Sequence, residues 1–345
     1  MKKIRVLIVD DSPIMHSLIA GTFRSSPDIE VIGAVKDPYE AREAIKVSSP
    51  DVITLDVEMP RMDGLSFLEK LMRLRPMPVV MVSALTQKGA AAAIKALMAG
   101  AVDCVGKPNG TAAAEEAFNR LPDIVRHAAR ANLSQRPSVE RSERPSITNA
   151  HSDDHVILLG ASTGGVDALC AVLAEFPRDC PPTFIVQHMP KGFTSTFAAR
   201  LDQLCAAHVT EASDRQPLSK GHVYLAPGGC RHLVLEGRDR MCCRLREGPA
   251  VNGHTPSVDQ LFHSALDHAH HVSAAVLTGM GNDGAAGLSA LRKAGAMTLC
   301  QDEQSSVVYG MPRAAFASGG AIHQLPLNKV GHALLTARVG AKAPT

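Results

Sequence analysis

The sequence predicts an α/β protein made of two successive doubly wound domains, each built on a parallel sheet. Short apolar runs rich in Val and Ile alternate with segments of helical spacing, first over the opening third of the chain and again over its second half. The stretch between the two series lacks apolar periodicity and is rich in Ser, Pro, Arg and Glu, as interdomain linkers are. The 345 residues, 45% of them hydrophobic, suffice for two cores. We therefore expect a first domain at 1–130, a linker at 131–154 and a second domain at 155–345.

The first series predicts a flavodoxin-like (βα)5 domain. Its strands are expected at residues 4–9, 31–35, 52–55, 79–82 and 102–105. Helical spacing predicts helices at 14–23, 41–47, 65–74, 90–98 and 112–131. Strand and helix thus alternate five times, which is typical of a parallel sheet covered by helices.

Polar side chains follow four of these strands. Asp10 and Asp11 follow the first, Asp56 the third, Ser83 the fourth and Lys107 the fifth. Because the carboxyl ends of parallel strands share one edge of the sheet, we expect these side chains to converge. Three carboxylates placed together attract a hard cation, and oxygen ligands are those that Mg²⁺ prefers, so the three Asp residues are its predicted ligands. Asp56 would accept a phosphoryl group, to which Ser83 would donate a hydrogen bond and whose charge Lys107 would neutralise.

Several segments of this first domain resemble a response-regulator receiver domain: VLIVDDSPIMH, DVITLDVEMPRMDG, VVMVSAL and the pair Lys107-Pro108. The resemblance implies phosphorylation at Asp56. Three positions before its lysine, that family usually has an aromatic switch residue, whereas this sequence has Cys104, so the resemblance does not extend to an aromatic rotamer at that position. The alternative is an ordinary doubly wound domain with acidic strand ends.

Bulk properties disfavour several classes of protein. The formal net charge is only +2, and three Tyr, nine Phe and no Trp offer few platforms for stacked bases, so we expect no nucleic-acid partner. No Cys-x-x-Cys pair occurs among the eight cysteines, which favours free thiols. No apolar run is long enough for a signal peptide or for direct membrane insertion, which predicts a cytoplasmic protein.

The second domain begins with a strand, a tight turn and a helix. The strand at 155–159 leads into the sequence GASTGG, and a helix is expected from residue 166. Ser162 therefore occupies the Gly-x-Ser-x-Gly spacing of a nucleophile elbow. A glycine-rich turn whose serine only caps the helix, or a phosphate-binding loop, is the alternative interpretation.

A serine nucleophile needs a base and a group that orients the base. His188 follows the strand expected at 183–186, and Asp283 lies in a glycine-rich loop after the strand expected at 274–277. The order Ser, His, Asp differs from that of α/β-hydrolases and disfavours a lipase fold. Backbone N–H groups of Thr163, Met280 or Gly281 are the predicted oxyanion donors.

The second half of the chain resembles the CheB protein-glutamate methylesterase family through GASTGG, QHMPKGFTSTFAARLD, VYLAPGG, TPSVDQLF, LTGMGNDGAAGL and VVYGMPRAA. The resemblance implies that Ser162, His188 and Asp283 form a triad that hydrolyses glutamate methyl esters on methyl-accepting chemotaxis receptors, releasing methanol, and deamidates receptor glutamines. It implies no cofactor for this step. It also implies that a chemotaxis histidine kinase phosphorylates the receiver, which would uncover the catalytic site.

Two other functions remain open from the sequence: a receiver-gated serine hydrolase for a different ester or amide, and a non-catalytic signalling adaptor. The loop at 249–259 could frame the substrate or only connect elements. A metal site on a histidine-rich helix is a further, weaker alternative, with candidate ligands His263, His268, His270 and His271.

Overall fold

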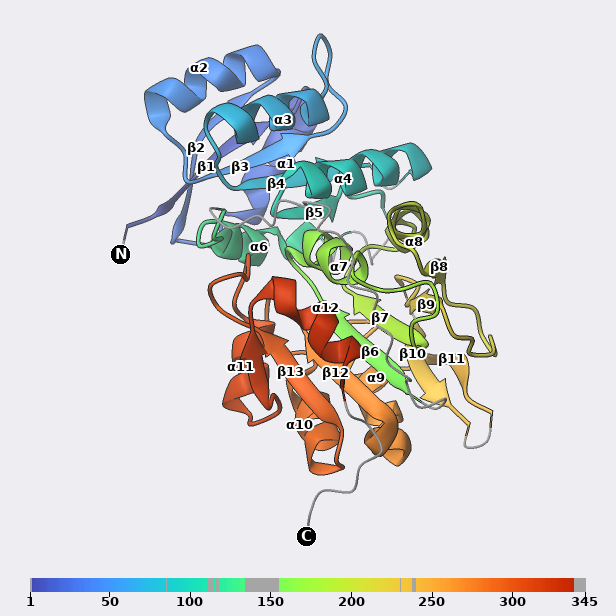
Figure 1. The fold of residues 1–345 in the computed structure, drawn as a ribbon. Helices are drawn as coiled ribbons and strands as arrows, with labels where there is room; N and C mark the ends of the chain where they lie inside the picture. The colour runs from blue at the N-terminus through green and yellow to red at the C-terminus, as the bar shows by residue number, and fades with distance from the viewer. Residues whose placement is uncertain are drawn as a thin grey trace. The chain divides into compact units, whose positions relative to one another are not determined.

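The structure is a computed structural model. It describes residues 2–84, 86–110, 115, 118–133, 155–229, 231–237 and 240–337. The chain forms two compact units, residues 1–134 and 135–345 (Figure 1), and each is described by itself. Most of the linker expected at 131–154 lies outside the described residues. None of the helices in the described ranges combines the length and apolar character needed to cross a membrane.

The first unit contains a five-stranded parallel sheet in the order β2-β1-β3-β4-β5. Its strands are β1 (Ile4–Val9), β2 (Ile29–Val35), β3 (Val52–Asp56), β4 (Val79–Ser83) and β5 (Asp103–Gly106). Its helices are α1 (Pro13–Thr22), α2 (Pro38–Ser48), α3 (Gly64–Leu74), α4 (Gln87–Ala99) and α6 (Leu121–Ala128). The expected strands and the first four helices are confirmed, with small differences at their ends.

The helix expected at 112–131 is wrong as a single element. Part of it lies outside the described residues, and the rest is interrupted by a turn at Arg120 before α6 begins. Pro122 occupies the first turn of α6, where its missing N–H is tolerated. In a continuous helix the same ring would clash with the preceding turn, so the helix ends and restarts.

The second unit contains a seven-stranded sheet in the order β14-β13-β12-β6-β7-β9-β8, and all its strand pairs are parallel. The strands are β6 (Val156–Ala161), β7 (Thr183–Gln187), β8 (His208–Glu211), β9 (His222–Leu225), β12 (Val272–Val276), β13 (Met297–Gln301) and β14 (His323–Leu325). Outside this sheet, β10 (Arg231–Glu236) and β11 (Cys242–Glu247) form an antiparallel hairpin. The doubly wound parallel sheet expected for this half is confirmed.

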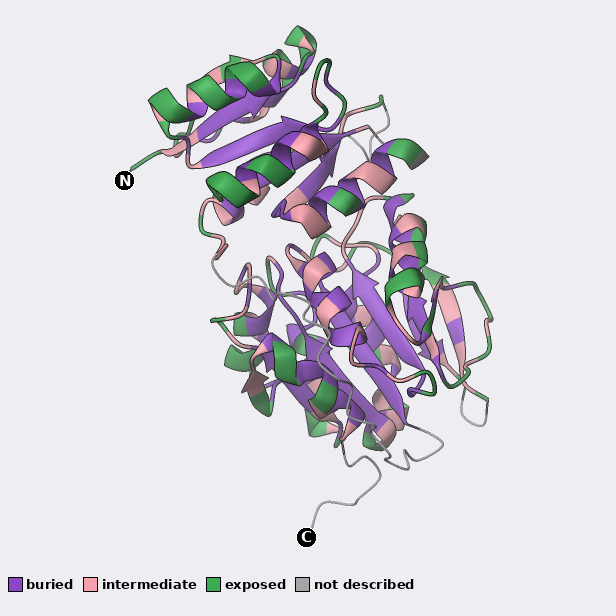
Figure 2. Cartoon of the chain, turned by 45° about the horizontal axis from the view of Figure 1, so that its top comes forward, coloured by how far each residue is buried: buried purple, intermediate pink, exposed green. Residues whose placement is uncertain are grey.

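Helices connect these strands. They are α7 (Gly165–Leu173), α8 (Phe193–Leu204), α9 (Val258–Ser264), the 3₁₀ helix η1 (Leu266–His271), α10 (Ala285–Lys293), α11 (Met311–Ala317) and α12 (Leu327–Leu335). Figure 2 shows that the central strands of each unit are buried, whereas most helices have exposed and buried faces. Fully buried aromatic side chains such as Phe184 and Phe262 fill the core of this unit.

Strand order fixes where the functional groups of the second unit meet. The central strand β6 has β7 on one side and β12 on the other, so the chain winds outward in two directions from β6. Such a switch point opens a crevice at the carboxyl ends of the strands.

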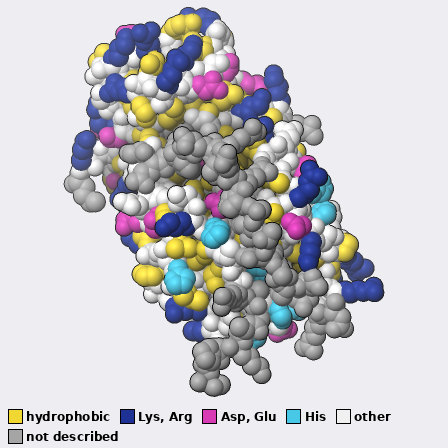
Figure 3. All heavy atoms as spheres, in the orientation of Figure 1, with side chains coloured by type: hydrophobic (Ala, Val, Ile, Leu, Met, Phe, Trp, Pro, Cys, Tyr) yellow, Lys and Arg dark blue, Asp and Glu magenta, His cyan; other side chains and the backbone are white. Residues whose placement is uncertain are grey.

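In the face that Figure 3 draws, Lys and Arg side chains are distributed over both units.

Candidate active site

The turn after β6 places Ser162 at the carboxyl edge of the sheet. The N–H of Gly165, the first residue of α7, donates to the Ser162 carbonyl (2.7 Å), which closes the turn. Gly164 has φ +77°, and a Cβ there would lie 2.6 Å from Cβ of Val307. Only glycine combines that left-handed conformation with so close a neighbour. The turn is therefore a sharp strand-to-helix connection that begins at Ser162.

Thr278, which lies just after the neighbouring strand β12, braces this turn. Its carbonyl accepts the Ser162 N–H (3.0 Å), and its hydroxyl donates to the Thr163 carbonyl (3.0 Å). The same hydroxyl accepts the Val308 N–H (2.9 Å), and the Thr278 N–H donates to the buried Gln301 side chain (2.8 Å). The backbone on both sides of the Ser162 side chain is thus held by hydrogen bonds to a buried residue.

His188 lies directly after β7. This strand pairs with β6, which Ser162 follows. The His188 N–H donates to the Ala161 carbonyl (3.1 Å), and the Gln187 side chain donates to the Ser162 carbonyl (2.9 Å). The structure therefore brings the backbones of Ser162 and His188 together at adjoining strand ends. Within the described residues, no hydrogen bond joins their side chains.

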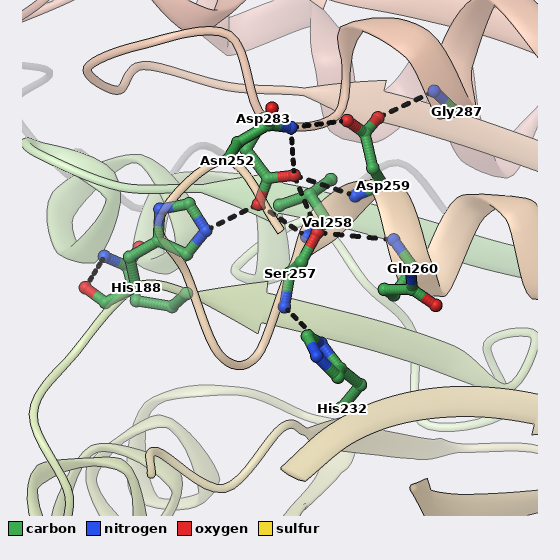
Figure 4. Close-up of polar contacts among 10 residues, drawn as sticks. His188, His232, Asn252, Ser257, Val258, Asp259, Gln260, Asp283 and Gly287 are labelled. Atoms are coloured by element: carbon green, nitrogen blue, oxygen red, sulfur yellow. Dashed lines mark hydrogen bonds and ion pairs between the residues drawn. The ribbon is translucent and has the colours of Figure 1, made fainter. Parts of the chain in front are cut away.

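The His188 ring pairs with Asp283, as Figure 4 shows. Nε2 of His188 lies 2.9 Å from Oδ2 of Asp283, and the side chains are only 8% and 1% exposed. Because the carboxylate accepts, Nε2 carries the hydrogen and the neutral ring has Nδ1 as its free acceptor. Nδ1 is buried and has no hydrogen-bond partner in the described parts of the chain. Asp283 thus orients the ring, and the Nδ1 atom of His188 is left available as a base.

The Asp283 carboxylate also accepts hydrogen bonds from one loop and helix start. Oδ1 accepts from the Ser257 hydroxyl (2.8 Å), from the Asp259 N–H (3.1 Å) and from the Asn252 side chain (3.4 Å), and Oδ2 accepts from the Val258 N–H (2.8 Å) (Figure 4). Burial opposes ionisation of Asp283, but these bonds and the His188 ring outweigh it and hold its pKa well below its usual range. Asp283 is therefore a permanent anion near neutral pH.

The low pKa of Asp283 predicts a pH-dependent contribution to stability. An acid whose folded pKa lies below its unfolded value of about 3.9 stabilises the fold above that pH, and the contribution is lost as the pH falls. Asp283→Asn should lower the free energy of unfolding by on the order of 2 kcal/mol near neutral pH. Urea unfolding of both proteins between pH 7 and pH 3 should show this difference shrinking on acidification; a difference that stays constant or grows would contradict the assignment.

Sequence reasoning missed most of the groups around Asp283. Ser257 and Gln260 have the spacing of a capping box, and the Ser257 side chain does accept from the Gln260 N–H. That signal could have predicted a helix start, where N–H groups favour an anion. His232 was also missed: its Nδ1 accepts the Ser257 N–H (3.1 Å), and its Nε2 donates to the Pro249 carbonyl (3.1 Å).

The predicted oxyanion donors lie around the same serine. A Cβ on Gly279 would lie 2.8 Å from Cβ of Ser162, so the backbone leading to Met280 passes directly beside the serine. Among the described residues, the N–H groups of Met280 and Gly281 have no acceptor. Thr163 immediately follows the serine and is buried. The three groups predicted as donors therefore belong to segments that adjoin Ser162.

In the first unit, the side chains of Asp10, Asp11, Asp56 and Lys107 converge at the strand ends. One carboxylate oxygen each from Asp10, Asp11 and Asp56 lies within 4.8 Å of the others. Lys107 Nζ lies 3.0 Å from Asp10 Oδ2 and 2.8 Å from Asp56 Oδ2. Burial raises the pKa of Asp56, with Lys107 opposing the rise. Burial also opposes the charge on Lys107, but its bonds to Asp56 and Asp10 outweigh it and raise the pKa of Lys107.

The structure also places two other groups of sequence-predicted residues, Ser83 and the histidines around η1. Ser83 is buried at the end of β4, and its hydroxyl donates to the Gly89 carbonyl (3.3 Å) at the start of α4. The histidines around η1 form no cluster with metal-binding geometry in the described part of the chain, where the only such group is that of Asp10, Asp11 and Asp56.

Comparisons with known proteins agree with this geometry. Residues 157–334 match the family model for CheB methylesterase, and residues 6–119 match that for the response regulator receiver domain. The chain is 51% identical to a protein-glutamate methylesterase/protein-glutamine glutaminase 1 of Caulobacter vibrioides, with 97% of this chain and 98% of that protein covered. A Yersinia pestis protein-glutamate methylesterase/protein-glutamine glutaminase is 50% identical, with 97% of each chain covered. The solved catalytic domain of Thermotoga maritima CheB methylesterase superposes with a TM-score of 0.51 at 33% identity, covering 52% of this chain and 97% of that domain.

Proposed function

The chain belongs to the CheB methylesterase family and is a protein-glutamate methylesterase and protein-glutamine glutaminase with a receiver domain, and we propose that Ser162, His188 and Asp283 carry its chemistry. The observation that supports this assignment is the buried pair of His188 and Asp283, which leaves Nδ1 of His188 as an unused base beside the strand end that bears Ser162. The proposed substrates are methylated glutamates and particular glutamines of methyl-accepting chemotaxis receptors.

In the proposed first step, Ser162 Oγ attacks the side-chain carbonyl carbon of the substrate, and its proton passes to Nδ1 of His188. Asp283 stabilises the imidazolium that forms, because it faces Nε2 as an anion. N–H groups of Thr163, Met280 or Gly281 would donate to the oxyanion of the tetrahedral intermediate. The intermediate collapses when the bond to the leaving group breaks, and methanol or ammonia departs with the proton from Nδ1.

In the second step, water hydrolyses the acyl-enzyme. His188 Nδ1 takes a proton from the water as its oxygen attacks the acyl carbon, and then returns that proton to Ser162 Oγ as the ester bond breaks. The products are a free glutamate side chain and the regenerated serine. Ester and amide substrates give the same product, which accounts for two activities at one site.

We also propose that Asp56 is the phosphorylated residue of the receiver domain, with the chemotaxis histidine kinase as phosphodonor. The oxygen-only donor set of Asp10, Asp11 and Asp56 fits Mg²⁺, which when bound would offset the negative charge of the phosphoryl group. Lys107 already lies between two of these carboxylates and would contact the phosphoryl oxygens. Ser83 would exchange its bond to the Gly89 carbonyl for one to the phosphoryl group.

Phosphorylation of Asp56 is expected to activate the catalytic domain by shifting a two-state equilibrium. Methanol release from membranes that contain methylated receptors should rise with a small-molecule phosphodonor, by about 5- to 150-fold as is typical of allosteric coupling. Asp56→Asn should abolish the rise, whereas Glu30→Gln, an exposed acid on β2, should leave it intact.

Two outcomes would reject these assignments. Stimulation that persists in Asp56→Asn would place the phosphorylated residue elsewhere. No methanol from receptor membranes, although the protein hydrolyses a simple activated ester, would favour a serine hydrolase with a different ester or amide substrate.

A further inference from the structure

A second histidine lies flat against His188. The ring centroids of His188 and His254 are 3.7 Å apart and the rings are inclined by only 4°. The other ring pairs in the described residues are separated by 5.1 to 6.1 Å. His254 is half-buried and lies in the loop that joins β11 to α9, far from His188 in the sequence. The contact therefore depends on how this loop is held.

A tight turn fixes the loop at His254. The backbones of Val251 and His254 exchange two hydrogen bonds (3.0 and 2.9 Å), and the residues between them, Asn252 and Gly253, have φ of +52° and +76°. Left-handed conformations at both central positions are those of a two-residue hairpin turn. His254 thus leaves the turn in a defined direction.

The same turn is tied to Asp283. The Asn252 side chain donates to Asp259 Oδ2 (2.8 Å) and to Asp283 Oδ1 (3.4 Å) (Figure 4). Asp259 is buried, and its other oxygen accepts the Gly287 N–H (2.7 Å) at α10. One short turn therefore contacts both members of the His188–Asp283 pair, through Asn252 on the carboxylate and through His254 on the ring.

The hydrogen bond to Asp283 does not by itself fix the plane of the His188 ring. Asp283 Oδ2 fixes the position of Nε2, but the ring can still tilt about the line that joins the two atoms. Nδ1 has no partner among the described residues, so no bond on that side opposes the tilt. A flat ring 3.7 Å away does oppose it, because tilting would bring atoms of the two rings into overlap.

We propose that His254 is a positioning residue that holds the plane of the His188 ring, so that Nδ1 faces the oxygen of Ser162 during proton transfer. This inference rests on the proposed function of Ser162 and His188. What His254 contributes is a flat face, not a proton or a bond to the substrate. A planar replacement should therefore preserve the effect, whereas one that fills the volume without a plane should not.

The test compares three variants of the full chain, activated by phosphodonor, in methanol release from methylated receptor membranes. His254→Ala and His254→Leu should lower kcat by about 10- to 100-fold with little change in KM, because a small misplacement of a reacting group has an effect of that size. His254→Phe should stay within about threefold of wild type by the same reasoning. His208→Ala is the matched control: this exposed histidine packs edge-on against His222, and its loss should leave the rate unchanged.

A nuclear magnetic resonance measurement provides a readout independent of activity. In the resting enzyme, the Hε1 resonance of His188 should shift when His254 becomes Ala or Leu, because the adjacent ring current is lost, and should be largely retained with Phe. Wild-type rates in His254→Ala, or a Phe variant as slow as Ala, would overturn the proposal. A change confined to KM would also overturn it and would make His254 a substrate contact. If Ser162→Ala still releases methanol, the proposed role of Ser162 is wrong. The resonance shifts then still measure whether the His254 ring stacks on His188.

Discussion

Replacing Ser162 by alanine is expected to lower methanol release by about 10⁴-fold or more, because the nucleophile is lost while binding and oxyanion stabilisation remain. The fold should tolerate the change. The hydrogen bonds that hold this residue use its backbone: its N–H donates to Thr278, and its carbonyl accepts from Gly165 and Gln187. Its hydroxyl has no hydrogen-bond partner within the described ranges, so alanine breaks none.

Methanol release from methylated receptor membranes measures the effect, and thermal unfolding checks that the variant is folded. Ser195→Ala is the matched control, since this serine is exposed on α8 and its hydroxyl donates to the Gly192 carbonyl. A folded Ser162→Ala protein that retains more than about a hundredth of wild-type activity would exclude Ser162 as the nucleophile.

Replacing Asp283 by asparagine is expected to lower kcat by about 10⁴-fold, the size known for loss of an orienting carboxylate in a serine triad. An asparagine amide can donate to Nε2 of His188, which an aspartate cannot. The hydrogen of the neutral ring would then move to Nδ1, the atom that must accept the proton of Ser162. The imidazolium would also lose its anion, so both the tautomer and the charge would be wrong for catalysis.

The measurement is kcat for methanol release after phosphorylation, with Asp267→Asn at an exposed position of η1 as control. The neutral tautomer gives a second readout, because nitrogen chemical shifts distinguish a protonated Nδ1 from a protonated Nε2 in His188. A variant with unchanged tautomer and activity within tenfold of wild type would show that Asp283 does not orient the base.

The strands that carry the proposed catalytic residues were predictable from sequence, because buried parallel strands are continuously apolar and their carboxyl ends share an edge. The groups that hold Asp283 were not. Two of its donors are backbone N–H groups, at Val258 and Asp259, which leave no mark on side-chain chemistry. Asn252 and His254 lie in a loop whose placement depends on tertiary contacts, so neither periodicity nor motif spacing could place them. The interruption of the expected helix was indicated in the sequence by Pro122, but the prediction followed the helical periodicity of the apolar residues instead.

The position of β6 between β7 and β12 has a consequence for the order of synthesis and activity. β7 follows β6 closely in the chain, but the Thr278 brace on Thr163 spans 115 positions and the His188 pair with Asp283 spans 95. When the ribosome has synthesised only β6 and β7, the nascent chain contains Ser162 and His188. It still lacks Thr278, which braces the turn, and Asp283, which orients the base. Contacts of such long sequence separation form late and slowly in folding. Assembly of the proposed site therefore requires synthesis through Asp283 and addition of β12 to the sheet beside β6.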